Sequence, residues 1–337
     1  MIQSTQPEPL KAKDFASDQE VRWCPGCGDY AILKGVQKTL AEVGATRDKT
    51  VFVSGIGCAA RFPYYMSTYG FHTIHGRAPA IATGLKLANP DLDVWVISGD
   101  GDALSIGGNH TLHVLWRNVD VQILLFNNEI YGLTKGQTSP TSQRGTVSPS
   151  TPRGSIDNPV HPLSFALGAG ARFVARGIDI NLKHLGEVMV AAHAHRGASF
   201  VEIFQNCIVF NDGCFSEFTA RENTASSQLL VEHGKPLRYG PDGSKGLVFD
   251  PSTWNLKAVD VGPDGVGEDE LVVHDETNRA LALRLGELRP PEFPMAIGIL
   301  YRDSAETYNE AVLEGAPAAG ASLSDVLRGG RTWTVSD

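Results

Sequence analysis

The amino-acid sequence predicts an α/β fold, in which a parallel sheet carries helices on both faces and is followed by a C-terminal extension. Short apolar runs such as residues 94–98 (VWVIS) and 121–126 (VQILLF) alternate with longer segments of helical periodicity. Both runs are followed by glycine, aspartate or asparagine, which are typical where strands of a parallel sheet end beside a ligand. The helical segments between successive strands can serve as the crossovers that parallel strands require.

The first hundred residues predict a helix and two strand–helix units. Residues 50–58 (TVFVSGIGC) indicate a short strand ending in glycines, and residues 72–90 indicate a glycine-bearing turn that opens a helix. Residues 93–102 (DVWVISGDGD) indicate a buried strand, and residues 104–117 a helical crossover. An N-terminal helix is predicted at residues 29–43, because five apolar side chains lie roughly on one face: Ile32, Leu33, Val36, Leu40 and Val43.

The alternation continues to about residue 207. Residues 121–134 predict a strand with its loop, and residues 165–179, 185–195 and 199–207 resume the pattern of strands and helices. Between them, residues 136–160 are rich in Ser, Thr, Pro and Gly and too polar to pack. This segment is therefore either a disordered surface loop or a lid over a site.

The character of the chain changes near residue 216. The later sequence is acidic and rich in turns, with short apolar pieces and a late strand at residues 293–301 (FPMAIGILY). We therefore expect a ligand-binding domain at residues 1–215 and an extension at 216–337 that packs on this core or on a partner subunit.

The composition is that of an ordinary soluble globular protein. The 337 residues are 42% hydrophobic and 20% charged, and the net charge of −9 argues against nucleic acid as the main partner. The first twenty residues are polar and lack the apolar core of a signal peptide, and no apolar run is long enough to span a membrane. We expect a cytoplasmic protein with no membrane partner.

Polar residues follow two successive predicted strands. Asp100 follows one strand and Asn127–Asn128 follow the next, so a right-handed βαβ unit would place them side by side. The Asp100 carboxylate, the Asn128 side chain and the Ile130 carbonyl could then reach one cation, and Mg²⁺ would complete its shell with water and phosphate oxygens. A GDG stretch by itself is also an ordinary turn; the pair of motifs is the stronger signal.

Four cysteines form a second candidate site. Two residues separate Cys24 from Cys27, and single cysteines follow at 58 and 207. Inert buried thiols, a structural zinc and an iron–sulfur cluster all remain open from this spacing, although zinc sites usually contain two close pairs. Cys214 has no assigned ligand role and is expected to be a packed thiol. A Rossmann dinucleotide site is disfavoured, because no G-x-G-x-x-G opens a helix after a strand.

The two motifs together resemble known sequences. GDG followed by NN resembles the signature of thiamine diphosphate (ThDP)-dependent enzymes. With WCPGCGD, GIGC, HGRAPAIATGLKLANPDL and NNEIYGLTKGQTSPT, residues 20–215 resemble the β subunits of 2-oxoacid:ferredoxin oxidoreductases, most closely the 2-oxoglutarate (KorB-like) type. The resemblance implies a ThDP-binding domain of the diphosphate-binding (PP) type.

The resemblance also implies a role for individual residues. It assigns Asp100, Asn128 and the Ile130 carbonyl to Mg²⁺, and Cys24, Cys27, Cys58 and Cys207 to a [4Fe-4S] cluster. His75 would donate to the diphosphate or cap a turn. The expected ThDP pocket consists of Ile56, Gly57, Cys58, His75, Gly76, Gly99, Asp100, Gly101, Asp102, Asn128, Ile130, Tyr131, Gly132, Leu133 and Thr134.

The implied reaction is oxidative decarboxylation of 2-oxoglutarate to succinyl-CoA and CO₂. Coenzyme A would accept the acyl group, ferredoxin would accept the electrons, and an α (or fused γα) subunit would supply the pyrimidine-binding domain, so that the isolated chain is inactive. Arg61 is a candidate for the second carboxylate of the substrate, or for a salt bridge to the partner subunit. Lys135 is a candidate for substrate or coenzyme A phosphate, or a solvated lysine.

Three other functions remain open at this stage. The substrate could be pyruvate or another 2-oxoacid. A non-redox ThDP decarboxylase or carboligase would not need the four cysteines. A noncatalytic iron–sulfur or zinc scaffold would not need GDG and NN.

Overall fold

A computed structural model describes residues 9–315 and 322–329. The first eight residues of the polar N-terminal segment, and residues 316–321 and 330–337 of the expected extension, lie outside the described residues. The helices are η1 (Ala12–Phe15), α1 (Asp29–Glu42), η2 (Ala59–Tyr65), α2 (Ala78–Ala88), α3 (Asp100–Leu104), α4 (Gly108–Trp116), α5 (Pro162–Gly168), α6 (Leu182–Ala194), α7 (Ser216–Thr219), α8 (Thr224–Ser227), η3 (Pro241–Gly243), η4 (Glu268–Glu270), α9 (Arg279–Glu287), α10 (Tyr308–Glu314) and α11 (Leu323–Arg328). The strands are β1 (Thr50–Ser54), β2 (Tyr69–His72), β3 (Asp93–Gly99), β4 (Gln122–Asn127), β5 (Ile130–Tyr131), β6 (Gln137–Thr138), β7 (Phe173–Ile178), β8 (Ser199–Phe204), β9 (Gln228–Val231), β10 (Arg238–Tyr239), β11 (Lys245–Asp250), β12 (Asn255–Asp260) and β13 (Met295–Arg302).

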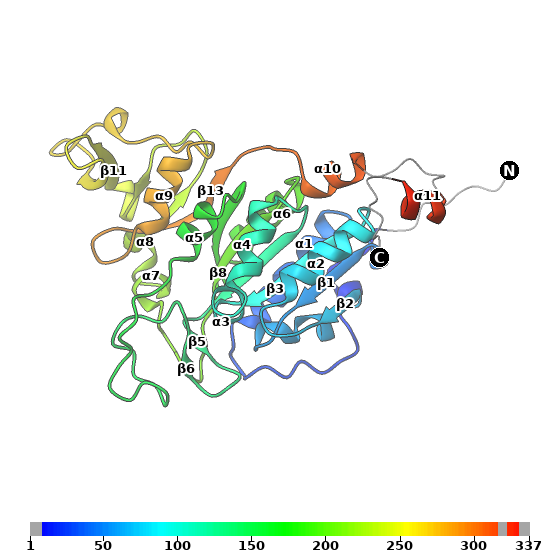
Figure 1. Ribbon diagram of the computed structural model, residues 1–337. Coiled ribbons are helices and arrows are strands. Elements are labelled where there is room, and N and C mark those ends of the chain that lie inside the picture. Colours follow the sequence, from blue (N-terminus) through cyan, green and yellow to red (C-terminus); the bar gives the residue numbers. More distant parts are fainter. Residues whose placement is uncertain (1–8, 316–321, 330–337) are drawn as a thin grey trace, which may run out of the picture.

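An eight-stranded sheet in the order β2-β1-β3-β4-β8-β7-β13-β9 forms the centre of the molecule (Figure 1). The strands from β2 to β7 in this order run parallel to one another. β13 runs antiparallel to β7 and parallel to β9. The predicted parallel α/β fold is confirmed, and the loops that follow β1, β3, β4 and β8 meet at one edge of the sheet.

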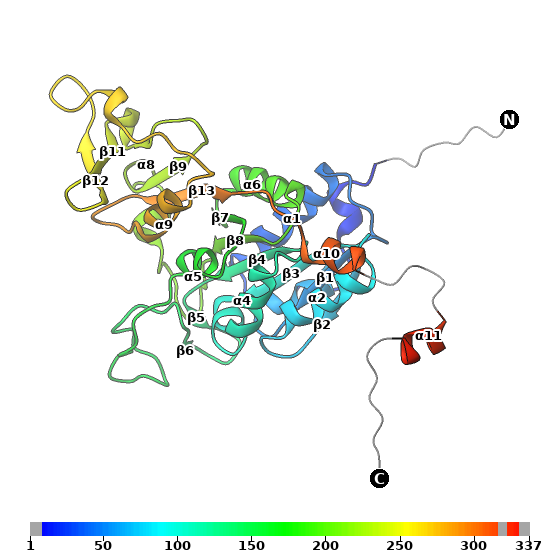
Figure 2. The ribbon, with the colours of Figure 1, turned by 45° about the horizontal axis from the view of Figure 1, so that its top comes forward.

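Helices cover both faces of this sheet, as the sequence predicts (Figure 2). Strand residues alternate between two apolar cores: Val94 and Val96 face one side, whereas Trp95 and Ile97 face the other. The first core contains residues from α2, α4, α5 and α9, and the second contains residues from α1, η2 and α6. Strands buried on both faces need apolar residues at every position, which is why these runs are continuously apolar in the sequence.

Three elements differ from the sequence prediction. The edge strand β2 is not predicted, because it has four residues, all exposed, and the alternation of Tyr69 and Phe71 is too short to mark a strand. Of the expected helix at 104–117, residues 108–116 form α4, whereas residues 100–104 form the short helix α3, although residues 100–102 were expected in the preceding strand; a turn separates the two helices. At this turn Gly76, with φ of +72°, lies so close to Gly107 that an added Cβ would be 2.5 Å from the Gly107 nitrogen. Only glycine fits such an approach of two backbones.

The third difference is the polar segment 136–160. The expectation that it is too polar to pack is wrong for its first part: Ser139, Thr141 and Ser142 are buried and hydrogen-bonded to residues at the carboxyl ends of the strands, which is not the behaviour of a disordered surface loop. A polar segment can be buried when each hydroxyl finds a partner, and here the partners are Asp100 and the Glu129 carbonyl.

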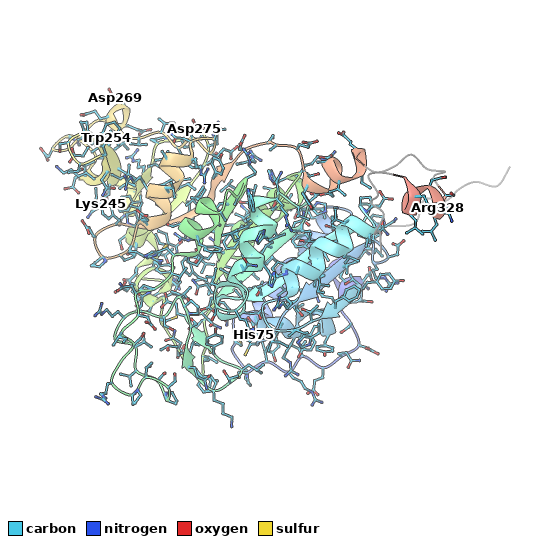
Figure 3. All side chains as sticks on the ribbon, viewed as in Figure 1. His75, Lys245, Trp254, Asp269, Asp275 and Arg328 are labelled. Carbon is cyan, nitrogen blue, oxygen red and sulfur yellow. The ribbon has the colours of Figure 1, made fainter. Side chains whose placement is uncertain are left out.

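The chain after residue 216 contributes to the main sheet. The predicted late strand is β13, which together with β9 extends the sheet beyond β7. β10, β11 and β12 form a separate antiparallel sheet. Figure 3 shows Lys245 and Trp254 of this small sheet at the upper left, far from His75 at the lower side. Among the described residues, no helix has the length and apolar character needed to cross a membrane.

Candidate functional site

The loops at the carboxyl ends of the central strands enclose a cavity. It is lined by fourteen of the fifteen residues expected in the ThDP pocket; the exception is Gly76, whose backbone lies behind the wall and donates to Asp102 at 2.7 Å. Parallel strands place their ends at one edge, so segments near residues 56, 100 and 130 come together there. The lining also includes four residues that the sequence analysis did not single out: Asp29, Ala59, Phe126 and Gln205.

Asp100 lies at the start of α3, directly after β3, and is buried. Its Oδ2 accepts hydrogen bonds from Ser139 Oγ and Thr141 Oγ1, each at 2.5 Å. Burial raises the pKa of Asp100 to about 6, although both hydroxyl donors oppose this shift. A buried carboxylate without a positive partner is unfavourable, so the position is suited to a cation.

Asp102 holds the neighbouring loops in place. Its Oδ1 accepts hydrogen bonds from the backbone nitrogens of Ile56 at 3.1 Å and Gly76 at 2.7 Å, and its Oδ2 accepts one from Ser98 Oγ at 2.5 Å. Asp102 also pairs with Nδ1 of His75, whose ring is partly exposed at the lower side of the molecule (Figure 3). Because a carboxylate only accepts hydrogen bonds, this pairing places a proton on Nδ1 of His75. In the neutral ring, Nε2 is then the hydrogen-bond acceptor.

The two asparagines at the end of β4 have different partners. Asn128 donates from Nδ2 to Gln205 Oε1 at 2.8 Å, and its Oδ1 accepts from the Ile130 nitrogen at 3.1 Å. Asn127 is turned toward the buried Glu202 and donates to its Oε1 at 2.8 Å. Asn128 and Ile130 therefore lie with Asp100 around one cavity, whereas Asn127 lies behind it.

The four cysteines singled out by spacing line a second cavity, of about 230 Å³. A Cβ added to Gly132 would lie 3.5 Å from the Sγ atoms of both Cys58 and Cys207, so both sulfurs lie beside this glycine. Cys214 is absent from the lining; it packs beside Phe215 and Phe218, and its Sγ lies 3.9 Å from the Asn128 carbonyl oxygen. The structure thus brings together Cys24, Cys27, Cys58 and Cys207.

The sulfur atoms surround this cavity without converging on one point. Among the described residues, no group of three or more His, Cys, Asp or Glu side chains is arranged to hold a single metal ion. A zinc site needs four ligands at about 2.0–2.3 Å from one atom. A cubic cluster instead takes one thiolate at each of its irons, which are spread around its volume. A cluster therefore does not require the four sulfurs to converge on one atom, as zinc does.

The electrostatics of this cavity oppose free thiolates. Burial, together with the nearby Asp29 carboxylate, raises the pKa of Cys58 to about 12 and also raises the pKa of Cys27. Burial also raises the pKa of Asp29 to about 7. Deprotonated sulfur here therefore requires a positively charged partner, which bound iron would supply.

The two cavities share a wall. Gln205 lies in this wall: its Oε1 accepts a hydrogen bond from Asn128 Nδ2, and its Nε2 lies 3.3 Å from the Cys27 sulfur. No motif marks Gln205 in the sequence; its position directly after strand β8 is the one available signal. The residues that line both cavities are Cys58, Asn128, Gly132, Leu133 and Gln205.

Both candidate catalytic cations face the cysteine cavity. Arg61 and Lys135 are part of its lining. Arg61 follows Cys58 by one helical turn and donates from Nε to the Tyr65 hydroxyl at 3.0 Å. Lys135 has a positive φ of 75° in the loop after β5.

Comparisons with known proteins agree with this geometry. Residues 55–203 match the family model "Thiamine pyrophosphate enzyme, C-terminal TPP binding domain". The chain is 50% identical to 2-oxoglutarate oxidoreductase subunit KorB of Mycobacterium tuberculosis, over 98% of this chain and 90% of that protein. It is 46% identical to the beta subunit of 2-oxoacid:ferredoxin oxidoreductase 1 of Aeropyrum pernix, over 58% of this chain and 62% of that one.

A solved structure is similar over nearly the full length. It is the 2-oxoglutarate:ferredoxin oxidoreductase from Magnetococcus marinus with 2-oxoglutarate, coenzyme A and succinyl-CoA bound. The similarity has a TM-score of 0.75 at 33% identity and covers 96% of this chain and 97% of that chain.

Proposed function

The chain belongs to the β subunits of the 2-oxoacid:ferredoxin oxidoreductases, of the 2-oxoglutarate type, and from this we propose the reaction and the role of each residue. The assembled enzyme oxidatively decarboxylates 2-oxoglutarate to succinyl-CoA and CO₂ and passes the electrons through a [4Fe-4S] cluster to ferredoxin. The observation that carries this proposal is the shared wall between the Asp100 cavity and the cysteine cavity.

We assign the first cavity to Mg²⁺ and thiamine diphosphate. Asp100, the Asn128 side chain and the Ile130 carbonyl would ligate Mg²⁺, since this set of oxygen donors suits a small hard cation. All three residues line the cavity, and within the described part of the chain the hydrogen-bond partners of the buried Asp100 carboxylate include no cationic side chain. When bound, thiamine diphosphate supplies the carbanion chemistry that decarboxylates a 2-oxoacid.

We assign the second cavity to the cluster. Cys24, Cys27, Cys58 and Cys207 would each ligate one iron, in keeping with their distribution around the cavity. A cluster accepts electrons one at a time, and the shared wall places it next to the first cavity. This arrangement favours a redox enzyme over a non-redox ThDP decarboxylase, which has no use for four thiols beside its cofactor.

A partner subunit completes the site. Thiamine diphosphate has a pyrimidine ring as well as a diphosphate, and in the described residues one large sheet carries one site of the diphosphate-binding type. We propose that an α (or fused γα) subunit binds the pyrimidine ring and covers the cavity mouth. The isolated chain would then retain its cluster but lack activity.

The visible spectrum of the anaerobically purified complex tests the proposal. A broad brown absorbance near 400 nm that bleaches on addition of 2-oxoglutarate with coenzyme A, and returns with ferredoxin, is the expected result. A colourless, zinc-loaded protein would support the scaffold alternative instead. A brown protein whose spectrum responds to pyruvate but not to 2-oxoglutarate would change the assigned substrate.

Arg61 is expected to select the dicarboxylate. Guanidinium pairs with a carboxylate through two parallel hydrogen bonds, and Arg61 lines the cavity next to the shared wall. Arg61→Met should lower kcat/KM for 2-oxoglutarate by roughly 30- to 800-fold, equivalent to about 2–4 kcal/mol for a buried charge left unpaired. Activity with pyruvate or 2-oxobutyrate should fall far less. Equal losses on all substrates would instead assign Arg61 to subunit assembly or coenzyme A binding.

Gly132 is expected to be required for the cluster. A Cβ at this position would already be in contact with the sulfurs of Cys58 and Cys207, at 3.5 Å from each, so the two further methyl groups of Gly132→Val would crowd the cavity that these sulfurs line. We expect Gly132→Val to purify with less than about half of the wild-type iron content, because extra methyl groups in a packed site displace the surrounding atoms and leave less room for a cluster. Gly168→Val is the matched control, since an added Cβ there meets open space. Full iron content in Gly132→Val would contradict the assigned position of the cluster.

A further inference from the structure

A buried ion pair lies behind the Asp100 cavity and has no part in the reaction proposed above. Arg176 on β7 donates from Nε to Glu202 Oε2 on β8 at 2.8 Å, and both side chains are completely inaccessible to solvent. Neither residue lines the Asp100 cavity or the cysteine cavity. Arginine and glutamate side chains are rarely fully buried in the middle of a sheet, so the presence of this pair has to be explained.

The far end of Arg176 is held by the C-terminal extension. Its Nη1 donates to the Ala296 carbonyl at 3.3 Å and lies 3.1 Å from the Met295 sulfur, both on β13. Its Nη2 donates to the Gly286 carbonyl on α9 at 3.3 Å. The guanidinium is therefore fixed by elements that follow Arg176 by a hundred residues or more along the chain.

The other oxygen of Glu202 fixes Asn127. Glu202 Oε1 accepts from Asn127 Nδ2 at 2.8 Å. Because a carboxylate only accepts hydrogen bonds, the amide nitrogen must face Glu202 and the amide oxygen must face the opposite way. There, Asn127 Oδ1 lies 3.1 Å from Thr141 Oγ1 and accepts from the Glu129 nitrogen at 3.3 Å.

Thr141 connects this amide to the metal-binding carboxylate. Its single hydroxyl proton can be donated to Asp100 Oδ2, 2.5 Å away, or to Asn127 Oδ1, 3.1 Å away, so the two acceptors share this one donor. A reversed Asn127 amide would turn its nitrogen toward Thr141 and Glu129 and place its oxygen against the Glu202 carboxylate. The ion pair thus sets the orientation of the Asn127 side chain, which contacts both Glu129 in the 128–130 loop and Thr141, the residue whose hydroxyl lies beside Asp100.

Stability by itself does not account for the pair. Removing two charges from water costs free energy that their attraction roughly offsets, and apolar side chains of similar volume are commonly as stable or more so. We propose that Arg176 and Glu202 are positioning residues: through Asn127 and Thr141 they hold Asp100 and the 128–130 loop in the geometry that binds Mg²⁺. This inference rests on the proposed function of the Asp100 cavity.

The test replaces the pair by apolar residues of similar size. In the full-length chain assembled with its partner subunit and stripped of Mg²⁺, Arg176→Met with Glu202→Leu should raise the Kd of thiamine diphosphate at fixed Mg²⁺ about tenfold, a loss typical of groups that orient metal ligands. The midpoint of thermal unfolding and the absorbance near 400 nm should stay at their wild-type values. A role in stability alone would shift the unfolding midpoint and leave the Kd unchanged.

Two further variants make the result decisive. Asn127→Leu keeps the ion pair but removes the amide, and it should raise the Kd to a similar extent; combined with the double variant it should add little, because both act through one contact. Lys86→Met with Asp120→Asn is the matched control: this pair is also largely buried, with 2.9 Å between Nζ and Oδ2, but lies outside the candidate site. The control should bind thiamine diphosphate like the wild type.

The outcomes separate this inference from the function on which it rests. Wild-type affinity in Asn127→Leu overturns the inference, whether or not the Arg176→Met/Glu202→Leu protein folds. Wild-type affinity in a folded Arg176→Met/Glu202→Leu protein also overturns it. If the wild-type complex itself fails to bind thiamine diphosphate with Mg²⁺, the proposed function fails first.

Discussion

Asp100→Ala is expected to abolish retention of thiamine diphosphate and Mg²⁺ while the brown colour of the cluster remains. Asp100 is the one anionic group among the three assigned Mg²⁺ ligands, and Mg²⁺ gives up its hydration water reluctantly without such a ligand. We expect the Kd of the cofactor to rise by at least about 100-fold, equivalent to roughly 2.7 kcal/mol. Calorimetric titration of the assembled complex, with iron content determined in parallel, measures both properties.

A conservative control separates the ligand from its surroundings. Asp100→Asn keeps the shape and can still interact with Ser139 and Thr141, which both contact Oδ2. It should fold like the wild type and still bind the cofactor poorly, because the charge is lost. Full occupancy and activity in Asp100→Ala would refute the metal assignment.

The second large effect is expected at the cysteines. Alanine at Cys24, Cys27, Cys58 or Cys207 should bleach the absorbance near 400 nm and abolish electron transfer to ferredoxin, because each thiolate is assigned to one iron. These four residues line the same cavity. We expect activity to fall at least about 1,000-fold, which corresponds to roughly 4 kcal/mol.

Cys214 is the matched control for this series. It lies seven residues after Cys207, but it packs beside Phe215 and Phe218 and does not line the cysteine cavity. Cys214→Ala should therefore keep its iron and its colour. Loss of iron in Cys214→Ala together with retention in Cys207→Ala would show that the fourth ligand is misassigned.

The sequence by itself determined the alternation of strands and helices and the chemistry of the two motifs. Strands buried on both faces must be apolar throughout, so residues 94–97 were recognisable without a structure. GDG and NN were recognisable because ligand-binding residues follow such strands directly. The grouping of Cys24 and Cys27 with two distant cysteines came from the sequence, but its assignment to an iron–sulfur cluster came from a family resemblance, because the spacing also fits zinc or inert thiols.

The tertiary structure decided everything that depends on which segments become neighbours. Gln205 stands between the two cavities because β8 lies beside β4, a pairing that no local pattern indicates. The polar segment at 139–142 is buried because its hydroxyls find Asp100 and Glu129, although its composition is that of a loop. The exposed strand β2 has only Tyr69 and Phe71 in alternation, which is too short a pattern to reveal it.

The same reason applies to the C-terminal extension. The sequence indicated a late strand but not that β13 would pair with β7 and hold Arg176. Periodicity reports which side of an element is buried, and a motif reports which ligand its side chains suit. Neither reports the order of the strands in the sheet, because that order follows from how all the elements pack together.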